Sequence, residues 1–218
     1  HGYTATTYVV QPIARAIFQN HIDTVAPLLP GHGLNDIQKA KLELNKVHWQ
    51  DWLHAARYEV ETARKSYQHV FVYGQSLGGA LALCMAAEGL VDGCAVSAAA
   101  VNANNFIKSL LALFGWIPLN IPVHVDLPYI TEAYPFTGIR GSQQTMKLGA
   151  YLRQKINQIA CPIFIGHSKK DPLLNPKIPA FIRSQVHGEC EIHWYDESGH
   201  TIPLVCHGEQ LAYDIAVF

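Results

Sequence analysis

The stretch VFVYGQSLGGAL, residues 70–81, combines an apolar strand, a sharp turn and the start of a helix. Within it, Gly74-x-Ser76-x-Gly78 places a glycine two positions before and two positions after a serine. A strand that turns directly into a helix brings these two positions into contact, so both must be small, and it pushes the side chain at the apex out above the sheet. The amides of the helix N-terminus then lie beneath that side chain. Ser76 is therefore predicted to be an exposed nucleophile.

A serine hydroxyl is a weak nucleophile, and it needs a general base that is oriented by an acid. Two later apolar runs end in loops that carry such groups. The run 161–167 is followed by Asp171 in GHSKKDPLL, and the run 190–196 is followed by His200 in WYDESGHTIP. Since the chain order serine, acid, histidine is the one expected for this kind of strand-turn-helix site, we interpret Asp171 as the acid and His200 as the base.

Other polar residues near these loops have simpler explanations. Asp196 and Glu197 lie at the end of a strand and too close to His200 in sequence to orient it easily. His167 and His193 lie in or beside strands, which is typical of histidines that belong to a sheet. The sequence favours Asp171 and His200 over all four.

A developing oxyanion requires two main-chain donors. The amide of Leu77, directly after the nucleophile, is the first candidate. The second should come from the loop after an earlier strand, and HGYT at residues 1–4 is of this type. The HGYT motif makes the amide of Tyr3 the second candidate.

Strands and helices alternate along the chain, which predicts an α/β fold with a mostly parallel sheet flanked by helices. The expected strands are 22–27, 69–73, 93–101, 161–167 and 190–196. The expected helices are 10–20, 48–67, 77–88 with a stop at Gly89, 176–186, and a last helix in QLAYDIAVF.

About 60 residues separate the strand 93–101 from the strand 161–167, where a dozen would make the crossover. Residues 102–155 are therefore predicted to be an insertion of short helices over the carboxyl edge of the sheet, where such sheets bind ligands. The insertion either extends the core or forms a small cap lined for an apolar substrate. In the second case Phe114 and Trp116 are candidate substrate-binding residues. The rest of the chain, 1–101 and 156–218, forms the core domain.

The composition excludes several classes of protein. Of the 218 residues 49% are hydrophobic and 15% are charged, with a net charge of -1, so no nucleic-acid partner is expected. The apolar run 110–122 is interrupted by Gly115 and Pro118, so we expect a soluble protein without stable membrane insertion. Five widely spaced cysteines without a C-x-x-C pair indicate reduced thiols, a cytoplasmic location and no metal site. The oligomeric state stays open.

The motifs HGYT, PGHG, GQSLGG, KKDPLL and SGHTIP occur in this order over essentially the whole chain. Together they resemble the α/β-hydrolase fold, and within it the small bacterial carboxylesterases and monoacylglycerol lipases. The resemblance implies Ser76 as nucleophile, Asp171 as acid, His200 as base and the amides of Tyr3 and Leu77 as oxyanion donors. It also implies a small cap at 102–155 and no cofactor. PGHG, with His32, would serve mainly to shape its loop.

This resemblance implies a serine hydrolase that cleaves small-molecule carboxylic esters of short to medium acyl chains. A hydroxycinnamoyl esterase or a thioesterase with the same triad is the alternative, and a ligand-binding homologue without catalysis is a weaker one. A nucleophilic aspartate is excluded because the apex residue is serine. A dinucleotide site is disfavoured because GQSLGG lacks the G-x-G-x-x-G spacing.

In the α/β-hydrolase fold the strand that leads into the HG loop is central. Here it would lie between the strands 22–27 and 69–73, and no residues before His1 supply it. We therefore expect one to three further strands on the N-terminal side. For the same reason the sequence makes no statement about a signal peptide.

Overall fold

Four parallel strands form the sheet at the centre of the computed structural model, which describes residues 1–102, 105–123 and 133–218. In spatial order they are β1 (Phe71–Gln75), β2 (Gly93–Ser97), β5 (Ile163–His167) and β6 (Cys190–Trp194). Val96 lies opposite Gly74 on one side and Ile165 on the other. β2 and β5 are buried along their whole length, as their continuous apolar composition predicts. The parallel α/β architecture is confirmed.

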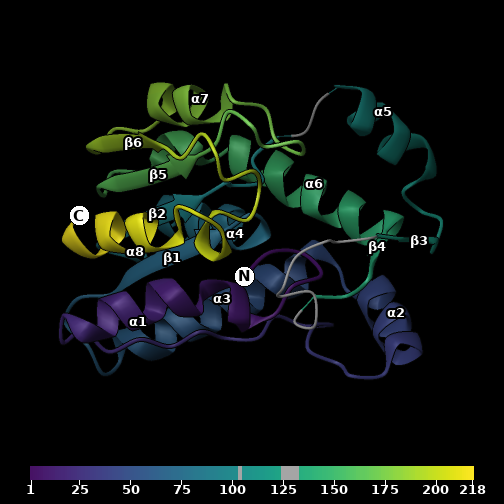
Figure 1. The fold of residues 1–218 in the computed structure, drawn as a ribbon, viewed down its shortest axis with the longest axis horizontal. Coiled ribbons are helices and arrows are strands. Elements are labelled where there is room, and N and C mark those ends of the chain that lie inside the picture. Colours follow the sequence, from purple (N-terminus) through teal and green to yellow (C-terminus); the bar gives the residue numbers. More distant parts are fainter. Residues whose placement is uncertain (103–104, 124–132) are drawn as a thin grey trace.

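Helices cover both faces of this sheet (Figure 1). One face is covered by α1 (Gln11–Gln19) and α8 (Gly208–Val217), and the other by α3 (Trp49–Arg64), α4 (Leu77–Ala87) and α7 (Ile178–Gln185). Since successive side chains of a strand point to opposite faces, Ala95 packs into the apolar core beneath α1 and α8, whereas Cys94 and Val96 pack into the core on the α4 side.

The remaining elements gather at one end of the sheet (Figure 1). They are α2 (Ile37–Lys46), α5 (Asn105–Phe114), the antiparallel pair β3 (Asn120–Pro122) and β4 (Phe136–Gly138), and α6 (Ile139–Arg153). Short 3-10 turns lie at Thr7–Val10, Ile156–Gln158 and Ile202–Leu204. α6 buries Leu148 and Leu152 in the core on the α4 side.

The predicted insertion 102–155 therefore contains α5, α6 and a strand pair that its composition did not indicate. Residues 103–104 and 124–132 of the insertion lie outside the described residues. That the segment caps a substrate stays a prediction.

The predicted strand at 22–27 is wrong, because these residues form no ladder hydrogen bonds in the structure. An extended segment becomes a strand only when a neighbour pairs with it, and no described segment pairs with this one. α2 was not foreseen, although Asp36 gives it a clear start by accepting hydrogen bonds from the amides of Gln38 and Lys39. β2 ends at Ser97, earlier than predicted, because Ala98 turns the chain with a positive φ of 44°.

The outer edge of β1 faces a groove instead of another strand. On the β2 side of the strand, the carbonyl of Val70 and the amide of Ser76 form main-chain hydrogen bonds. Since main-chain groups alternate along a strand, Phe71, Tyr73 and Gln75 turn theirs outward. No described residue pairs with those groups. That one to three further strands lie at this edge stays a prediction.

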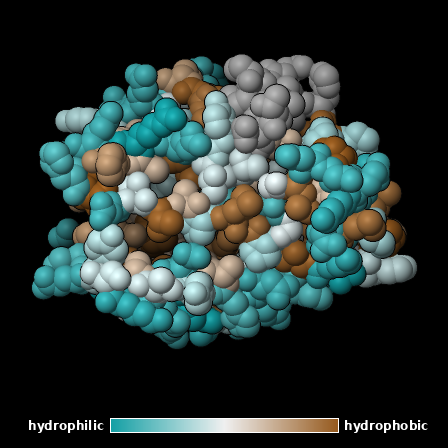
Figure 2. All heavy atoms as spheres, turned by 90° about the horizontal axis from the view of Figure 1, so that it is seen from below, coloured by the Kyte–Doolittle hydropathy of each residue, from teal (hydrophilic) through white to brown (hydrophobic). Residues whose placement is uncertain are grey.

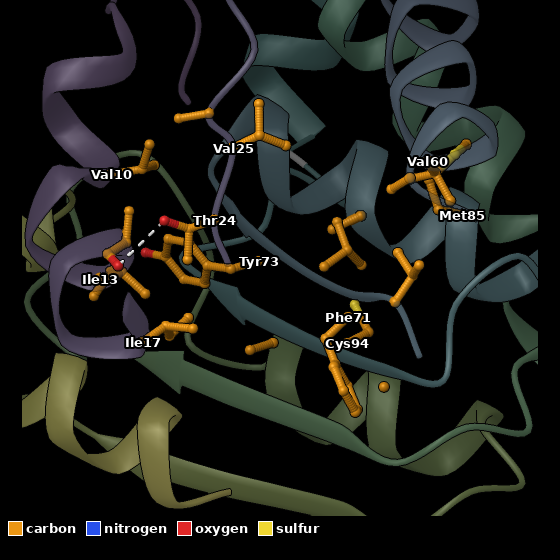
Figure 3. A pocket seen from close by; sticks show the side chains of 18 of the residues that line it. Val10, Ile13, Ile17, Thr24, Val25, Val60, Phe71, Tyr73, Met85 and Cys94 are labelled. Atoms are coloured by element: carbon orange, nitrogen blue, oxygen red, sulfur yellow. Dashed lines mark hydrogen bonds between the residues drawn. The ribbon is translucent and has the colours of Figure 1, made fainter. Parts of the chain in front are cut away.

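This β1-edge groove is a cavity of about 560 Å³. Most of its apolar lining comes from α1, the extended segment 22–27, β1, and the facing sides of α3 and α4. In Figure 3, Ile13 and Ile17 approach β1 from one side, while Val60 and Met85 lie on the other side of Tyr73. Figure 2 shows hydrophobic side chains gathered in a recess on one face of the molecule, between hydrophilic rims.

Within the described ranges, every helix is too short or too polar to cross a bilayer.

Candidate active site

Ser76 occupies the turn between β1 and α4 with strained backbone angles, φ 54° and ψ -112°. Glycine is required at both flanking positions, because main-chain atoms approach each of them closely. A Cβ atom on Gly74 would lie 2.1 Å from the carbonyl oxygen of Gly78, and one on Gly78 would lie 2.9 Å from the main chain of His1. The prediction that both positions must be small is confirmed. The turn leaves the Ser76 hydroxyl at the carboxyl end of the sheet.

The structure brings the three predicted side chains together. His200 Nε2 lies 3.0 Å from Ser76 Oγ, and His200 Nδ1 lies 2.8 Å from Asp171 Oδ2. The other carboxylate oxygen, Oδ1, accepts hydrogen bonds from the amides of Leu173 and Leu174 at 2.8 and 3.0 Å. His200 is thus held between the hydroxyl and a fixed carboxylate, which is the geometry that lets a histidine take a proton from a serine.

Asp171 is charged at neutral pH. Its side chain is fully buried, and burial alone raises the pKa of a carboxyl. The hydrogen bond and charge of His200 and the two amides of Leu173 and Leu174 outweigh this effect, so the pKa of Asp171 is lowered below its ordinary value. The carboxylate therefore stabilises a positive charge on the ring of His200.

The competing side chains have other partners. Asp196 and Glu197 form exposed ion pairs with Lys169 and Lys170. His193 faces Glu191 and Asp214 and lies away from the hydroxyl of Ser76. His167 is buried, and neither of its ring nitrogens has a hydrogen-bond partner among the described residues. Of these histidines and His200, only His200 bonds to both the serine and the acid.

The two predicted oxyanion amides belong to segments close to the elbow, since a Cβ atom on Gly2 would lie 3.4 Å from Ser76 Cβ. Leu77 is the first residue of α4, so its amide has no intrahelical acceptor. The amide of Tyr3 likewise has no acceptor among the described residues. The Tyr3 hydroxyl is turned away, since it donates to the carbonyl of Gly138 at 3.3 Å.

The carbonyl of Gly2 fixes the direction of the Tyr3 amide, because the C=O and N–H of a trans peptide point in opposite directions. Gly2 accepts from His1 Nδ1 at 3.0 Å and from the amide of Ala5 at 3.3 Å. His1 Nε2 in turn accepts from the amide of Leu29 at 3.0 Å. The ring of His1 is thereby locked, and it holds the peptide that carries the Tyr3 N–H.

Phe114 and Trp116 lie at the end of α5 and just beyond it, with exposed fractions of 46% and 70%. The indole N–H of Trp116 donates to the carbonyl of Leu113 at 3.0 Å. No hydrogen bond or ring contact joins either side chain to Ser76, Asp171 or His200 among the described residues. Their role toward a substrate stays a prediction.

Sequence reasoning missed Gln75 and Tyr134 and expected His32 only to shape its loop. Gln75 is buried, and its side-chain amide donates to the carbonyl of His200 at 3.3 Å. His32 Nε2 accepts from the amide of Thr4 at 3.2 Å, and the amide of Tyr134 donates to the carbonyl of Thr4 at 2.8 Å. A glutamine inside an apolar strand is a signal for the first, since a buried polar group needs a partner. No local pattern reveals the contacts that His32 and Tyr134 make with Thr4.

In the part of the chain that the structure describes, no three histidine, cysteine, aspartate or glutamate side chains cluster as ligands of a metal ion would.

Comparisons with known proteins place the chain in a family. A profile described as "Alpha/beta hydrolase family" matches residues 1–214. A thermostable monoacylglycerol lipase of Bacillus sp. (strain H-257) is 28% identical over 183 residues, covering 81% of this chain and 70% of that protein. A carboxylesterase of Bacillus subtilis (strain 168) is 24% identical over 216 residues, covering 94% of this chain and 83% of that protein.

Solved structures show the same fold. One from work on the metagenome-derived lipolytic enzymes LipS and LipT superposes with a TM-score of 0.88 at 24% identity, covering 100% of this chain and 90% of that one. The monoacylglycerol lipase of Paleococcus ferrophilus superposes with a TM-score of 0.80 at 14% identity, with the same coverage of both chains.

Proposed function

Because the chain belongs to the alpha/beta hydrolase family, we propose that it is a serine hydrolase that cleaves carboxylic esters of short to medium acyl chains through an acyl-enzyme. The observation that carries this proposal is the continuous line of hydrogen bonds from Ser76 Oγ through His200 to Asp171. The monoacylglycerol lipase and carboxylesterase relatives support the ester as substrate class.

In the first half of the reaction, His200 Nε2 takes the proton of Ser76 as Oγ attacks the ester carbonyl. Asp171 stabilises the imidazolium that forms and keeps the ring in the required orientation. The carbonyl π electrons move onto oxygen, and the amides of Leu77 and Tyr3 donate to this oxyanion. Collapse of the tetrahedral intermediate breaks the bond to the alcohol, which leaves with the proton held by His200.

In the second half, His200 removes a proton from a water molecule as the water attacks the acyl carbonyl of the acyl-enzyme. A second oxyanion forms at the same two amides, and its collapse returns the proton to Ser76 Oγ. The carboxylic acid is released and the hydroxyl of the serine is restored.

The acyl group should bind on the insertion side of Ser76, where the α5 region exposes apolar side chains. The β1-edge groove is a poor candidate for this role, because its lining contains none of Ser76, Asp171 and His200. The chain length of the acyl group follows from the insertion, part of which lies outside the described residues.

Initial rates on p-nitrophenyl esters from C2 to C16, with a Ser76→Ala variant in parallel, test the proposal. We expect a maximum at a short or medium chain length that disappears in the variant, together with labelling of Ser76 by a fluorophosphonate probe. Rates that are equal in the two proteins would reject the proposal.

A hydroxycinnamate ester and an acyl thioester belong in the same assay, because the triad does not select the leaving group. Faster turnover of either would assign the alternative substrate class to the same serine. Absence of labelling in the intact protein would instead favour a ligand-binding homologue.

A further inference from the structure

Thr4 adopts a backbone conformation that its side chain disfavours. Its φ is 65°, in the left-handed region that β-branched residues rarely occupy. Such a conformation persists only where surrounding contacts impose it. Thr4 directly follows Tyr3, the residue whose amide is an oxyanion donor in the proposed reaction.

Both main-chain groups of Thr4 are held by other segments of the chain. Its amide donates to His32 Nε2 at 3.2 Å, and its carbonyl accepts from the amide of Tyr134 at 2.8 Å. The Tyr134 hydroxyl is itself tied to the loop of His32, since it donates to the carbonyl of Gly31 at 3.1 Å and accepts from the amide of Leu34 at 2.9 Å.

The ring of His32 is fixed as a hydrogen-bond acceptor at Nε2. Its Nδ1 faces the carbonyls of Pro30 and Leu29 at 3.0 and 3.3 Å. Because a carbonyl only accepts, Nδ1 carries the proton and Nε2 keeps its lone pair for Thr4. Burial lowers the pKa of His32 to about 4, so the ring is neutral at neutral pH.

Aromatic neighbours prevent the ring of His32 from turning away. The ring of His1 meets it edge-on at 4.9 Å between centroids, and Tyr134 lies parallel to it at 6.4 Å. Trp52 packs at 6.1 Å. His32 is 4% exposed, so no solvent competes for Nε2.

The hydrogen bond between Thr4 and His32 helps to orient the Tyr3 amide, because that amide lies between two fixed peptide planes. His1 holds the plane between Gly2 and Tyr3 through the carbonyl of Gly2, and His32 holds the plane between Tyr3 and Thr4 through the amide of Thr4. Fixing the planes on both sides of a Cα atom fixes its φ and ψ, and with them the direction of the Tyr3 N–H.

We propose that His32 is a positioning residue for the oxyanion loop, residues 2–5, and that it acts by accepting the amide of Thr4. This inference rests on the proposed ester hydrolysis. It adds a function to a loop whose motif indicated only a structural role.

The test is a matched pair of substitutions. His32→Asn keeps a donor near the position of Nδ1 but has no acceptor at the position of Nε2, whereas His32→Gln places an amide oxygen there. We expect His32→Asn to lower kcat on a p-nitrophenyl ester by about 10- to 100-fold with little change in KM, since misplacing a catalytic group by about 1 Å has an effect of this size. His32→Gln should recover most of the loss. The exposed His54 provides the control, and His54→Asn should behave as the wild type.

A thionoester of the same acid distinguishes positioning from general loosening. Sulfur accepts hydrogen bonds poorly, so the ratio of oxoester to thionoester rates reports on the oxyanion donors. This ratio should fall in His32→Asn and return in His32→Gln. An unchanged ratio in a His32→Asn protein that has lost activity would overturn the proposal, and so would full activity of that variant.

Hydrogen exchange of the Thr4 amide gives a readout that does not depend on catalysis. It should be slow in the wild type and in His32→Gln, and faster in His32→Asn; equal exchange in all three would overturn the proposal. Lack of esterase activity in the wild type, with Thr4 exchange following the pattern above, would reject the proposed function and leave the loop contact established.

Discussion

The carboxyl end of β1 and its outer edge differ in how completely their polar groups are paired. At its carboxyl end, Ser76, His200 and Asp171 are joined by hydrogen bonds, and the second oxygen of Asp171 is also satisfied. Along its outer side, β1 presents to the apolar β1-edge groove main-chain groups that no described residue pairs with. The groove has a volume of about 560 Å³, yet its lining contains none of Ser76, Asp171 and His200, so the proposed chemistry lies at the paired end. Chemical capability thus follows from converging polar groups, and cavity volume alone does not indicate it.

The largest effect is expected from Ser76→Ala. If the carboxyl end of β1 holds the nucleophile, this change should lower kcat on p-nitrophenyl esters by at least about 10⁴-fold. The thermal midpoint should stay within about 2 °C, because the hydroxyl bonds only to His200 among the described residues. Residual activity within 100-fold of the wild type would place the nucleophile elsewhere.

Asp171→Asn is expected to lower kcat by about 10⁴-fold, since an amide cannot stabilise the imidazolium and favours the wrong tautomer of His200. Pre-steady-state labelling of Ser76 by a fluorophosphonate should slow in parallel. The surface change Asp196→Asn serves as the control, because the carboxylate of Asp196 forms an ion pair with the exposed Lys169. Equal effects of the two substitutions would contradict the assignment.

The Asp171→Asn variant also tests how the stability of the fold depends on pH. The pKa of Asp171 is lowered in the folded protein, so its charge stabilises the fold above the ordinary carboxyl pKa of about 4. This contribution is lost as the pH falls through the lower pKa of the folded state. The difference in thermal midpoint between wild type and Asp171→Asn should therefore be largest near pH 7 and shrink toward pH 2. A difference that grows on acidification would show that the pKa is raised.

Hydrogen exchange of the β1 amides tests the same comparison without any substitution. Val72 and Gly74 face β2, whereas Phe71, Tyr73 and Gln75 face the β1-edge groove. Hydrogen exchange in the 218-residue chain should be at least about tenfold faster for the second set. Equal protection of both sets would mean that a further segment pairs with this edge.

The smallest effect is expected in the groove itself. Val25 lines it and is 72% exposed, so Val25→Ser should change kcat/KM by less than about twofold and the free energy of unfolding by about 0.5 kcal/mol or less. A tenfold loss of activity with an intact fold would show that the groove contributes to the active site after all.

The sequence alone determined the elbow, the three side chains that the structure joins by hydrogen bonds, and the alternation of strands and helices. These are local signals: Gly74 is required by main-chain atoms of Gly78, four residues away, and the apolar runs of β2 and β5 reflect burial on both faces. Gln75 carried a readable signal of the same kind, because a buried amide in a strand must find a partner.

Only the tertiary structure decided how the oxyanion loop is held and which extended segments become strands. His32 and Tyr134 meet Thr4 from segments about 30 and 130 residues away, and no local pattern records such contacts. Residues 22–27 have the composition of a strand, but the hydrogen bonds that define one must come from a neighbour. Pairing and long-range contact are properties of the folded chain, because they depend on which distant residues arrive at the same place.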